Sequence, residues 1–251
     1  MGDALLSHVL ERVAAAPLRS EPFAHLYFER IFPEGFYDAL LRHLPDPSLY
    51  EPLFHKDALR PDGSTTRSTF TLDEASIARV PVESRETLRR CATAFASDDL
   101  RDAILGRYAS VMRARFGPGG VPPLEATVKL QRDLPGYRIG VHPDTTDKVV
   151  LIQLYLPATD AHRHMGTSLY VKKGQGFELA STLAFARNTG FSFAKTADSW
   201  HGVEPVVDAE RNSLTVNYRL RDQKLRRTLH KRVVRQLRRL ARRLRSAPGA
   251  A

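Results

Sequence analysis

A change of sequence texture near Pro122 is the feature that most constrains the fold of this chain. Before it, apolar residues recur at helical spacing, and after it short strand-like runs alternate with turns. Beyond a short amphipathic helix at the N-terminus, the predicted helices cover residues 33–44, 83–96 and 98–116, with an isolated strand at 67–73. The predicted strands cover residues 125–133, 148–156, 167–173, 190–195, 200–206 and 211–220. Helices followed by strands predict an α+β fold with an antiparallel sandwich or barrel in its C-terminal half.

The positive charge of the chain is concentrated at its C-terminus. Residues 219–251 hold thirteen of the 38 basic residues and one of the 28 acidic ones, so the remaining 218 residues carry 25 basic and 27 acidic side chains. We therefore predict one catalytic domain over residues 1–218, with a helical part over 1–120 and a strand-rich core over 121–218. A basic C-terminal helix over 219–251 follows it.

Two interpretations of the basic segment stay open. Its apolar residues recur every three or four positions, which predicts a helix with one narrow apolar stripe among arginines. The helix either packs on the domain or on a second subunit as a homodimer, or contacts an anionic membrane or another polyanion through residues 224–245. The segment 219–251 contains no aromatic residue on which bases could stack, which argues against nucleic acid as the partner.

The remaining bulk features predict a cytoplasmic protein, peripheral to the membrane if the basic helix binds lipid. Cys91 is the only cysteine, so no internal disulfide can form, as is usual in a reducing compartment. The N-terminus has no basic region ahead of an apolar stretch, and no apolar run approaches the roughly 20 residues that span a bilayer.

Three residues predict a metal centre. His142 and Asp144 are two positions apart, and in an extended chain such residues point to the same side. Pro143 between them favours an extended conformation at His142. His201 follows 57 residues after Asp144, at the end of another strand-like run. Two histidines and one carboxylate form the facial triad that suits non-haem Fe(II).

A second polar group follows the distal histidine. Arg211 lies ten residues after His201, and Ser213 shares its face of the predicted strand 211–220. An arginine fork with a neighbouring hydroxyl is well suited to hold a carboxylate. Thr215 and Asn217 continue this polar face, whereas Leu214, Val216, Tyr218 and Leu220 form the opposite, apolar one.

The spacing of His-x-Asp, the distal histidine and Arg-x-Ser resembles the Fe(II)/2-oxoglutarate-dependent oxygenase superfamily, over about residues 128–218. The resemblance implies a double-stranded β-helix (jelly-roll, cupin-like) core braced by N-terminal helices, with His142, Asp144 and His201 as iron ligands. It also implies that 2-oxoglutarate meets Arg211 and Ser213 through its distal carboxylate. In prolyl-hydroxylase-like members a tyrosine often joins them, at the place that Tyr155 takes here.

The resemblance implies a dioxygenase that uses Fe(II), 2-oxoglutarate and O2, hydroxylates an unactivated C–H bond and releases succinate and CO2. A small biosynthetic molecule is the expected substrate. Hydroxylation of a protein or peptide residue and a non-catalytic jelly-roll binding module are the alternatives. Asn217 stands where the superfamily's nucleic-acid demethylases carry a second arginine, which disfavours nucleic-acid repair. Further contacts to substrate or cosubstrate are expected from Gln131, Arg132, Arg138, Gln153 and Asn217.

Overall fold

A computed structural model describes residues 4–207 and 209–221, so the predicted basic helix from residue 222 onward lies outside the described part of the chain. The helices are α1 (Ala4–Ala15), α2 (Glu34–Arg42), α3 (Glu74–Ile77), α4 (Val82–Ala96), α5 (Asp98–Arg107) and α6 (Ala109–Phe116). The first strands are β1 (Leu18–Arg19), β2 (His25–Glu29), β3 (Glu51–Pro52), β4 (Arg67–Thr71), β5 (Leu124–Asp133) and β6 (Ile139–His142). The others are β7 (Lys148–Tyr155), β8 (Thr167–Lys173), β9 (Gly176–Leu183), β10 (Thr189–Ala194), β11 (Trp200–Val203) and β12 (Arg211–Leu220).

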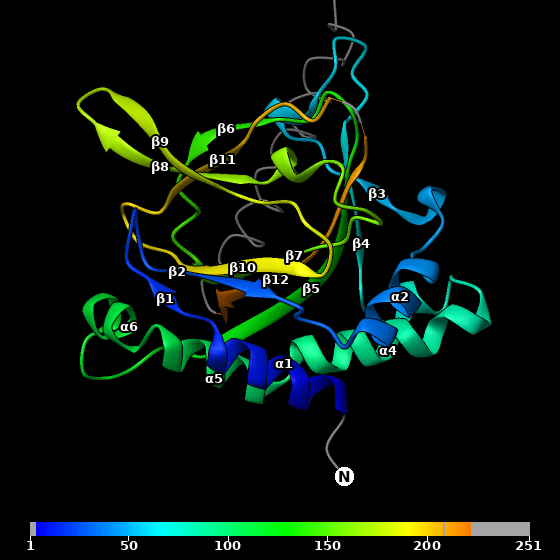
Figure 1. The fold of residues 1–251 in the computed structure, drawn as a ribbon, viewed down its shortest axis with the longest axis horizontal. Helices are drawn as coiled ribbons and strands as arrows, with labels where there is room; N and C mark the ends of the chain where they lie inside the picture. The colour runs from blue at the N-terminus through cyan, green and yellow to red at the C-terminus, as the bar shows by residue number, and fades with distance from the viewer. Residues whose placement is uncertain (1–3, 208, 222–251) are drawn as a thin grey trace, which may run out of the picture.

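Eight of these strands form one antiparallel sheet, the major sheet, in the order β1-β2-β10-β7-β12-β5-β4-β3. Its central strand β7 has the sequence KVVLIQLY, and every residue after Lys148 is buried. A nearly continuous apolar run is what a strand covered on both faces requires. The major sheet therefore forms the middle layer of the molecule (Figure 1).

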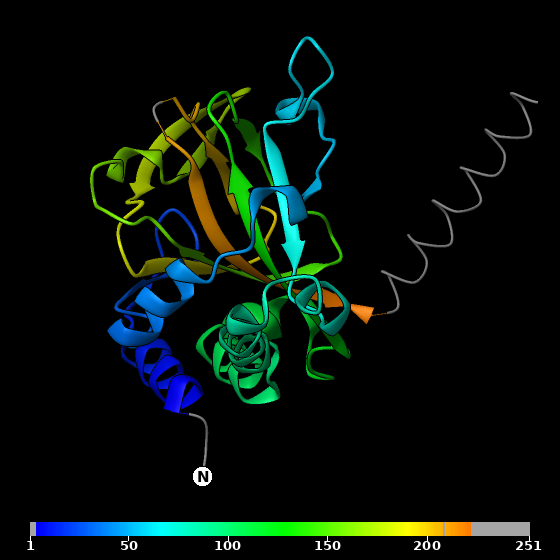
Figure 2. The same cartoon turned by 90° about the vertical axis from the view of Figure 1, so that its right-hand side faces the viewer.

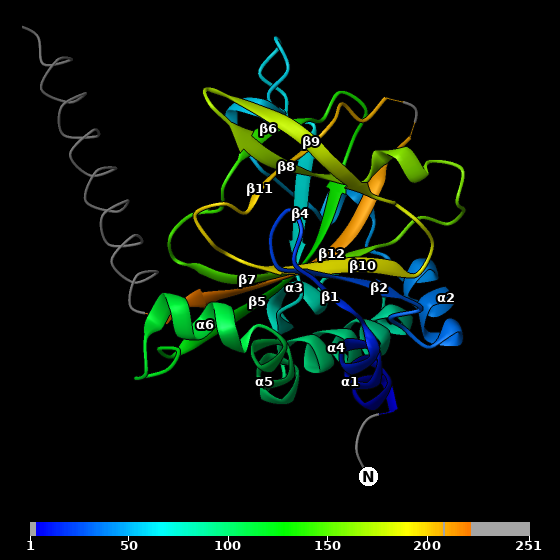
Figure 3. The ribbon, with the colours of Figure 1, turned by 60° about the vertical axis from the view of Figure 1, so that its left-hand side comes forward.

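The other four strands form the minor sheet, in the order β6-β11-β8-β9, which lies across the major sheet on the side away from the helices (Figure 3). The two facing sheets enclose one apolar cluster, which includes Leu151, Phe191, Phe193, Leu169 and Val203. The outer strand β9 is exposed along nearly its whole length. The predicted α+β class with an antiparallel sandwich is thus the observed architecture.

The helices cover the outer face of the major sheet (Figure 2). A second, larger apolar cluster fills this layer and joins Leu5 and Val9 of α1 and Leu88 of α4 to Leu214 and Val216 of β12. The alternation predicted for residues 211–220 is therefore confirmed on its apolar side. The N-terminal helices brace the sheet, as the sequence indicates.

The N-terminal part departs from the prediction in two ways. The predicted strand 67–73 is present as β4, but it is not isolated, because it belongs to the major sheet together with β1, β2 and β3, which were not predicted. Strand β2 escapes sequence analysis because it is only five residues long and its partner β10 lies about 160 residues away. The predicted helix 98–116 is interrupted at Tyr108 (φ −103°, ψ 23°), whose buried hydroxyl donates to the Ser192 carbonyl at 2.7 Å.

None of the helices within residues 4–207 and 209–221 combines the length and the apolar character that crossing a bilayer requires.

Candidate metal centre

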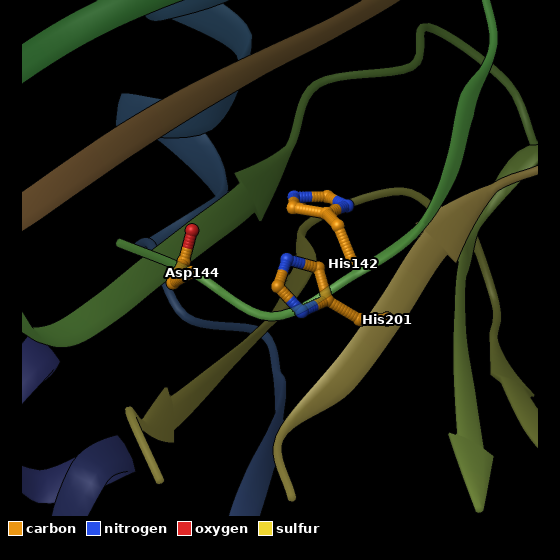
Figure 4. A group of neighbouring side chains, drawn as sticks. All are labelled: His142, Asp144 and His201. Atoms are coloured by element: carbon orange, nitrogen blue, oxygen red, sulfur yellow. The ribbon is translucent and has the colours of Figure 1, made fainter. Parts of the chain in front are cut away.

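His142, Asp144 and His201 lie together, as predicted, at one end of the minor sheet (Figure 4). His142 is the last residue of β6, Asp144 follows in the turn, and His201 belongs to β11. His142 and His201 are cross-strand partners, and their ring centroids are 4.5 Å apart. One ligand atom from each of the three residues lies within 4.8 Å of the others. Among residues 4–207 and 209–221, no other group of three or more potential metal ligands is found.

The close approach of β6 and β11 depends on a residue without a side chain. A Cβ atom at Gly202 would lie 2.9 Å from the Ile139 carbonyl oxygen, which is closer than real Cβ contacts. The pairing also contains an irregularity between His201 and Val203. Gly202 therefore allows the two strands to bring both imidazoles to one point.

Both imidazoles present an unprotonated nitrogen to the centre. The Nδ1 atom of His142 lies 2.9 Å from the Gly140 carbonyl, and that of His201 lies 3.0 Å from the Ser199 carbonyl. Because a carbonyl can only accept, Nδ1 carries the proton in each ring, and Nε2 has a free lone pair. Burial lowers the pKa of both rings, that of His201 to about 4, which keeps them neutral near pH 7.

Asp144 presents one oxygen to the same point. Its Oδ1 accepts from Lys148 Nζ at 2.5 Å, whereas its Oδ2 is buried and has no hydrogen-bond partner within the described part of the chain. Burial opposes ionisation, but Lys148 and the two imidazoles hold the pKa of Asp144 below its usual value. Sequence analysis missed Lys148. The turn 145–147 brings it to Asp144, and spacing of four residues indicates a pair only within a helix.

These donors fit Fe(II). Two neutral imidazole nitrogens and one carboxylate oxygen with no other partner make up the 2-His-1-carboxylate set, which leaves coordination positions open on the metal. The backbone hydrogen bonds of the two histidines fix their orientation, as is usual around metal ligands.

A cavity of about 510 Å³ adjoins the centre. His142, Asp144 and Lys148 form part of its wall. Arg67 and Tyr137 line it as well, and Phe54, whose side chain is largely exposed, stands at the loop between β3 and β4. Its volume lies within the range of small-molecule sites.

Arg211 lies on β12 and is completely buried. Its Nε donates to the Met165 carbonyl at 2.7 Å, its Nη2 donates to Thr167 Oγ1 at 3.1 Å, and its Nη1 donates to Asp133 Oδ2 at 2.9 Å. Asp133 also accepts two bonds from Arg67, at 2.6 and 2.9 Å. The arginine predicted to hold the cosubstrate thus belongs to a cluster of Arg67, Asp133 and Arg211. Sequence analysis indicated neither Arg67 nor Asp133.

Ser213 and Tyr155 are direct cross-strand partners and share the face that carries Arg211. Ser213 Oγ accepts from Gln153 Nε2 at 3.1 Å, and the Tyr155 hydroxyl accepts from the Thr167 backbone N–H at 2.9 Å. The Arg211 guanidinium lies 5.3 Å from the Tyr155 ring centroid. The structure therefore gathers these predicted cosubstrate residues and Gln153 into one polar area between the sheets.

The other residues expected to contact substrate or cosubstrate are spread over several places in the structure. Gln131 reaches Asp133, with Nε2 3.5 Å from Oδ2. Arg132 forms an ion pair with Glu210 at the surface, and Arg138 is exposed; neither lines the cavity. Asn217 is half-buried, and its Oδ1 has no hydrogen-bond partner among residues 4–207 and 209–221. Contacts from these residues to a ligand stay predictions.

No protein-family model matches the sequence, and no curated protein matches it. Solved structures do match. A prolyl-4-hydroxylase from Pseudomonas putida is 18% identical with a TM-score of 0.52, covering 86% of this chain and 99% of that one. A prolyl 4-hydroxylase from Phytophthora capsici is also 18% identical, with a TM-score of 0.57, covering 88% of this chain and 67% of that one. The chain therefore has the fold of the prolyl 4-hydroxylases, which confirms, at the level of the fold, the predicted resemblance to the Fe(II)/2-oxoglutarate-dependent oxygenases.

Proposed function

We propose that the protein is an Fe(II)- and 2-oxoglutarate-dependent dioxygenase that hydroxylates an unactivated C–H bond of a small molecule. The observation that supports this proposal most strongly is the geometry of His142, Asp144 and His201. Two Nε2 lone pairs and the unpartnered Asp144 Oδ2 converge, while every remaining polar atom of the three side chains is held by a backbone carbonyl or by Lys148. In this proposal the two facing sheets are a double-stranded β-helix.

Arg211, Ser213 and Tyr155 would hold the distal carboxylate of 2-oxoglutarate. Three of the five N–H groups of Arg211 donate to protein acceptors, which leaves two for a ligand. The low dielectric of this fully buried position strengthens a charge-assisted hydrogen bond. Bound Fe(II), with 2-oxoglutarate and O2, would supply the oxidant for hydroxylation, with succinate and CO2 as coproducts.

The chain's own residues would bind the metal, orient its ligands and shield the site from water. Lys148 keeps Asp144 turned towards the metal by occupying its other oxygen. Gly140 and Ser199 hold the imidazoles in the tautomer that coordinates through Nε2. The apolar cluster between the sheets, with Phe191 and Phe193, would limit the access of water from the interior side.

The size of the cavity favours a small molecule as the substrate, because about 510 Å³ accommodates a compound of drug-like size. Hydroxylation of a protein or peptide residue is the second candidate. The observation that favours it is the fold, since both structures compared above are prolyl 4-hydroxylases by name.

Succinate release in the presence of Fe(II), 2-oxoglutarate and O2 tests the proposed function. We expect the wild-type protein to release succinate and His201→Ala to release none above background. His164→Ala, in the exposed loop that also holds His162, serves as the matched control and should leave release unchanged. Absence of release from the wild type, together with absence of Fe(II) binding, would indicate the non-catalytic binding module instead.

A further inference from the structure

The cluster of Arg67, Asp133 and Arg211 carries more positive than negative charge. Asp133 and Arg211 are fully buried, and the Arg67 side chain is 14% exposed. Two guanidinium groups share one carboxylate, so one positive charge of the cluster is not balanced within it. Burying an unbalanced charge costs several kcal/mol, and a bound anion would remove that cost. The 2-oxoglutarate carboxylate proposed to meet Arg211 is one such anion, so a second carboxylate at Arg67 is argued from the donors at Arg67 and Tyr137.

The cluster is accessible to a ligand on one side. Arg211 is fully buried and does not line the cavity beside the metal centre, whereas Arg67 lines it together with His142 and Asp144. Arg67 uses Nε and Nη2 to grip Asp133, and this bidentate pair fixes the guanidinium plane. Its Nη1 takes part in neither bond, so it can donate to a ligand in the cavity.

Tyr137 provides an independent observation at the same place. Tyr137 is only 1% exposed and lines the cavity, and its hydroxyl makes no hydrogen bond of good geometry to the described residues, with the Arg67 guanidinium as its nearest polar neighbour. The Arg67 guanidinium stacks on its ring at 3.8 Å from the centroid. A buried hydroxyl without a partner is costly, and burial raises the pKa of Tyr137, so the group remains a donor.

Together these observations define one kind of ligand. A fixed guanidinium edge and a protonated hydroxyl side by side present two donors to an anion, and the positive charge of the guanidinium disfavours a cation. A carboxylate matches such donors in both charge and shape. Phe54 and Leu53, exposed on the loop between β3 and β4, add apolar surface to the same cavity.

We infer that Arg67 and Tyr137 form a carboxylate-binding subsite in the metal cavity, so that the protein acts on a substrate that carries a carboxylate. Asp133 is a positioning residue for this subsite, because it holds the Arg67 guanidinium against the Tyr137 ring. The inference rests on the proposed function for the identity of the centre beside the subsite. The same subsite chemistry would also suit the distal carboxylate of 2-oxoglutarate, and the experiment separates these two sources.

The experiment measures binding by calorimetry on the full-length, Fe(II)-loaded protein without oxygen, so that no turnover is needed. In the first arm, phenylacetate is compared with phenylacetamide while 2-oxoglutarate is saturating. In the second arm, 2-oxoglutarate is compared with 2-oxopentanoate, which keeps the keto acid but lacks the distal carboxylate. The variants are Arg67→Gln and Tyr137→Phe. Tyr137→Phe removes only the hydroxyl, which makes no hydrogen bond of good geometry to the described residues, and should leave the fold intact.

Two control variants change an arginine and a tyrosine of similar environment that lie outside the cavity. Arg187 is also paired with an aspartate, Asp38, and lies over a tyrosine ring, that of Tyr37, at 4.6 Å from the centroid. Tyr218 has a buried hydroxyl with no hydrogen-bond partner in the part of the chain that the structure describes, and it belongs to the apolar cluster between the helices and the major sheet. Arg187→Gln and Tyr218→Phe should therefore leave binding in both arms unchanged.

If the subsite binds the carboxylate of the primary substrate, Arg67→Gln weakens phenylacetate binding about 10- to 100-fold and Tyr137→Phe about 3- to 10-fold, with little change for the amide. If it binds the cosubstrate instead, the same losses occur for 2-oxoglutarate and not for 2-oxopentanoate. The inference would be overturned if both variants kept the wild-type preference for phenylacetate over phenylacetamide and for 2-oxoglutarate over 2-oxopentanoate. Should the wild type release no succinate while phenylacetate binding still depends on Arg67 and Tyr137, the proposed function fails and the subsite stands.

Discussion

The two facing sheets hold their charged residues in different ways. In the major sheet, Arg211 and Asp133 lie opposite each other in a pairing of β12 with β5 that runs over ten residues. Strands β4 and β7 flank this pair on either side, and both side chains are fully buried. Many backbone hydrogen bonds would have to break before either residue could move.

In the minor sheet, His142 and Asp144 depend on far less structure, whereas His201 is also paired with Leu169 of β8. The pairing of β6 with β11 has only two register positions, with an irregularity between them, and Asp144 lies outside any strand. Its orientation comes from one ion pair with Lys148. The difference teaches that the charge cluster contributes to the stability of the fold, whereas the metal centre is a local arrangement. Changes in the two sheets should therefore have separable effects.

The largest expected effect is on stability, from the major sheet. Asp133→Ala leaves Arg67 and Arg211 without their shared carboxylate and should lower the free energy of unfolding by about 3–5 kcal/mol, as measured by urea denaturation. Asp144→Ala is the matched change in the minor sheet. In the metal-free protein it should cost less than about 1 kcal/mol, since Lys148, its ion-pair partner among the described residues, can reach solvent. Equal losses in the two variants would refute the comparison.

The next effect is the pH dependence of stability of the metal-free protein. His201 has a pKa lowered to about 4 by burial, against 6.5 in the unfolded chain. The unfolded state therefore binds more protons between these values, so stability is complete above pH 6.5 and falls as the pH drops towards 4, by up to about 3 kcal/mol. His201→Leu should flatten this part of the stability–pH curve. An unchanged slope would mean that His201 is not buried in its neutral form.

A smaller effect is expected from the strand contact beneath the metal centre. Gly202→Ala places a Cβ against the Ile139 carbonyl and should push β6 away from β11, which weakens Fe(II) binding about 10-fold. Gly140→Ala, at a position of the same pairing with open space around a Cβ, should retain wild-type affinity. Comparable affinities for both variants would show that the approach of the two strands does not control the ligand geometry.

The smallest effect concerns the orientation of one ligand. Lys148→Met keeps the aliphatic part of the side chain but removes the ion pair to Asp144 Oδ1. We expect Fe(II) affinity to fall about 3- to 10-fold, with a steeper loss at acidic pH because the pKa of Asp144 is then no longer lowered by Lys148. Titration of Fe(II) at two pH values measures both. Lys195→Met, on the neighbouring strand end, provides the comparison for loss of a lysine near the site.

The sequence by itself determined the triad, Arg211 with Ser213, and most strands of the C-terminal half. The physical reason is that these features are local. Residues two apart in an extended chain share a side, and the apolar run of β7 indicates a strand covered on both faces. The sequence did not indicate β2 and β6, which are short, or β9, which is longer but exposed along nearly its whole length and so has no alternating apolar pattern.

Only the tertiary structure decided how the charges near the cavity are combined. Arg67 and Asp133 are 66 residues apart, and Asp133 and Arg211 are 78 residues apart. They meet because the register of β4, β5 and β12 places all three opposite one another. Likewise, Tyr137 becomes a candidate ligand-binding residue only because the fold stacks the Arg67 guanidinium on its ring. Local spacing specifies which side chains share a face, but strand register specifies which of them neutralise each other and which are left to bind a ligand.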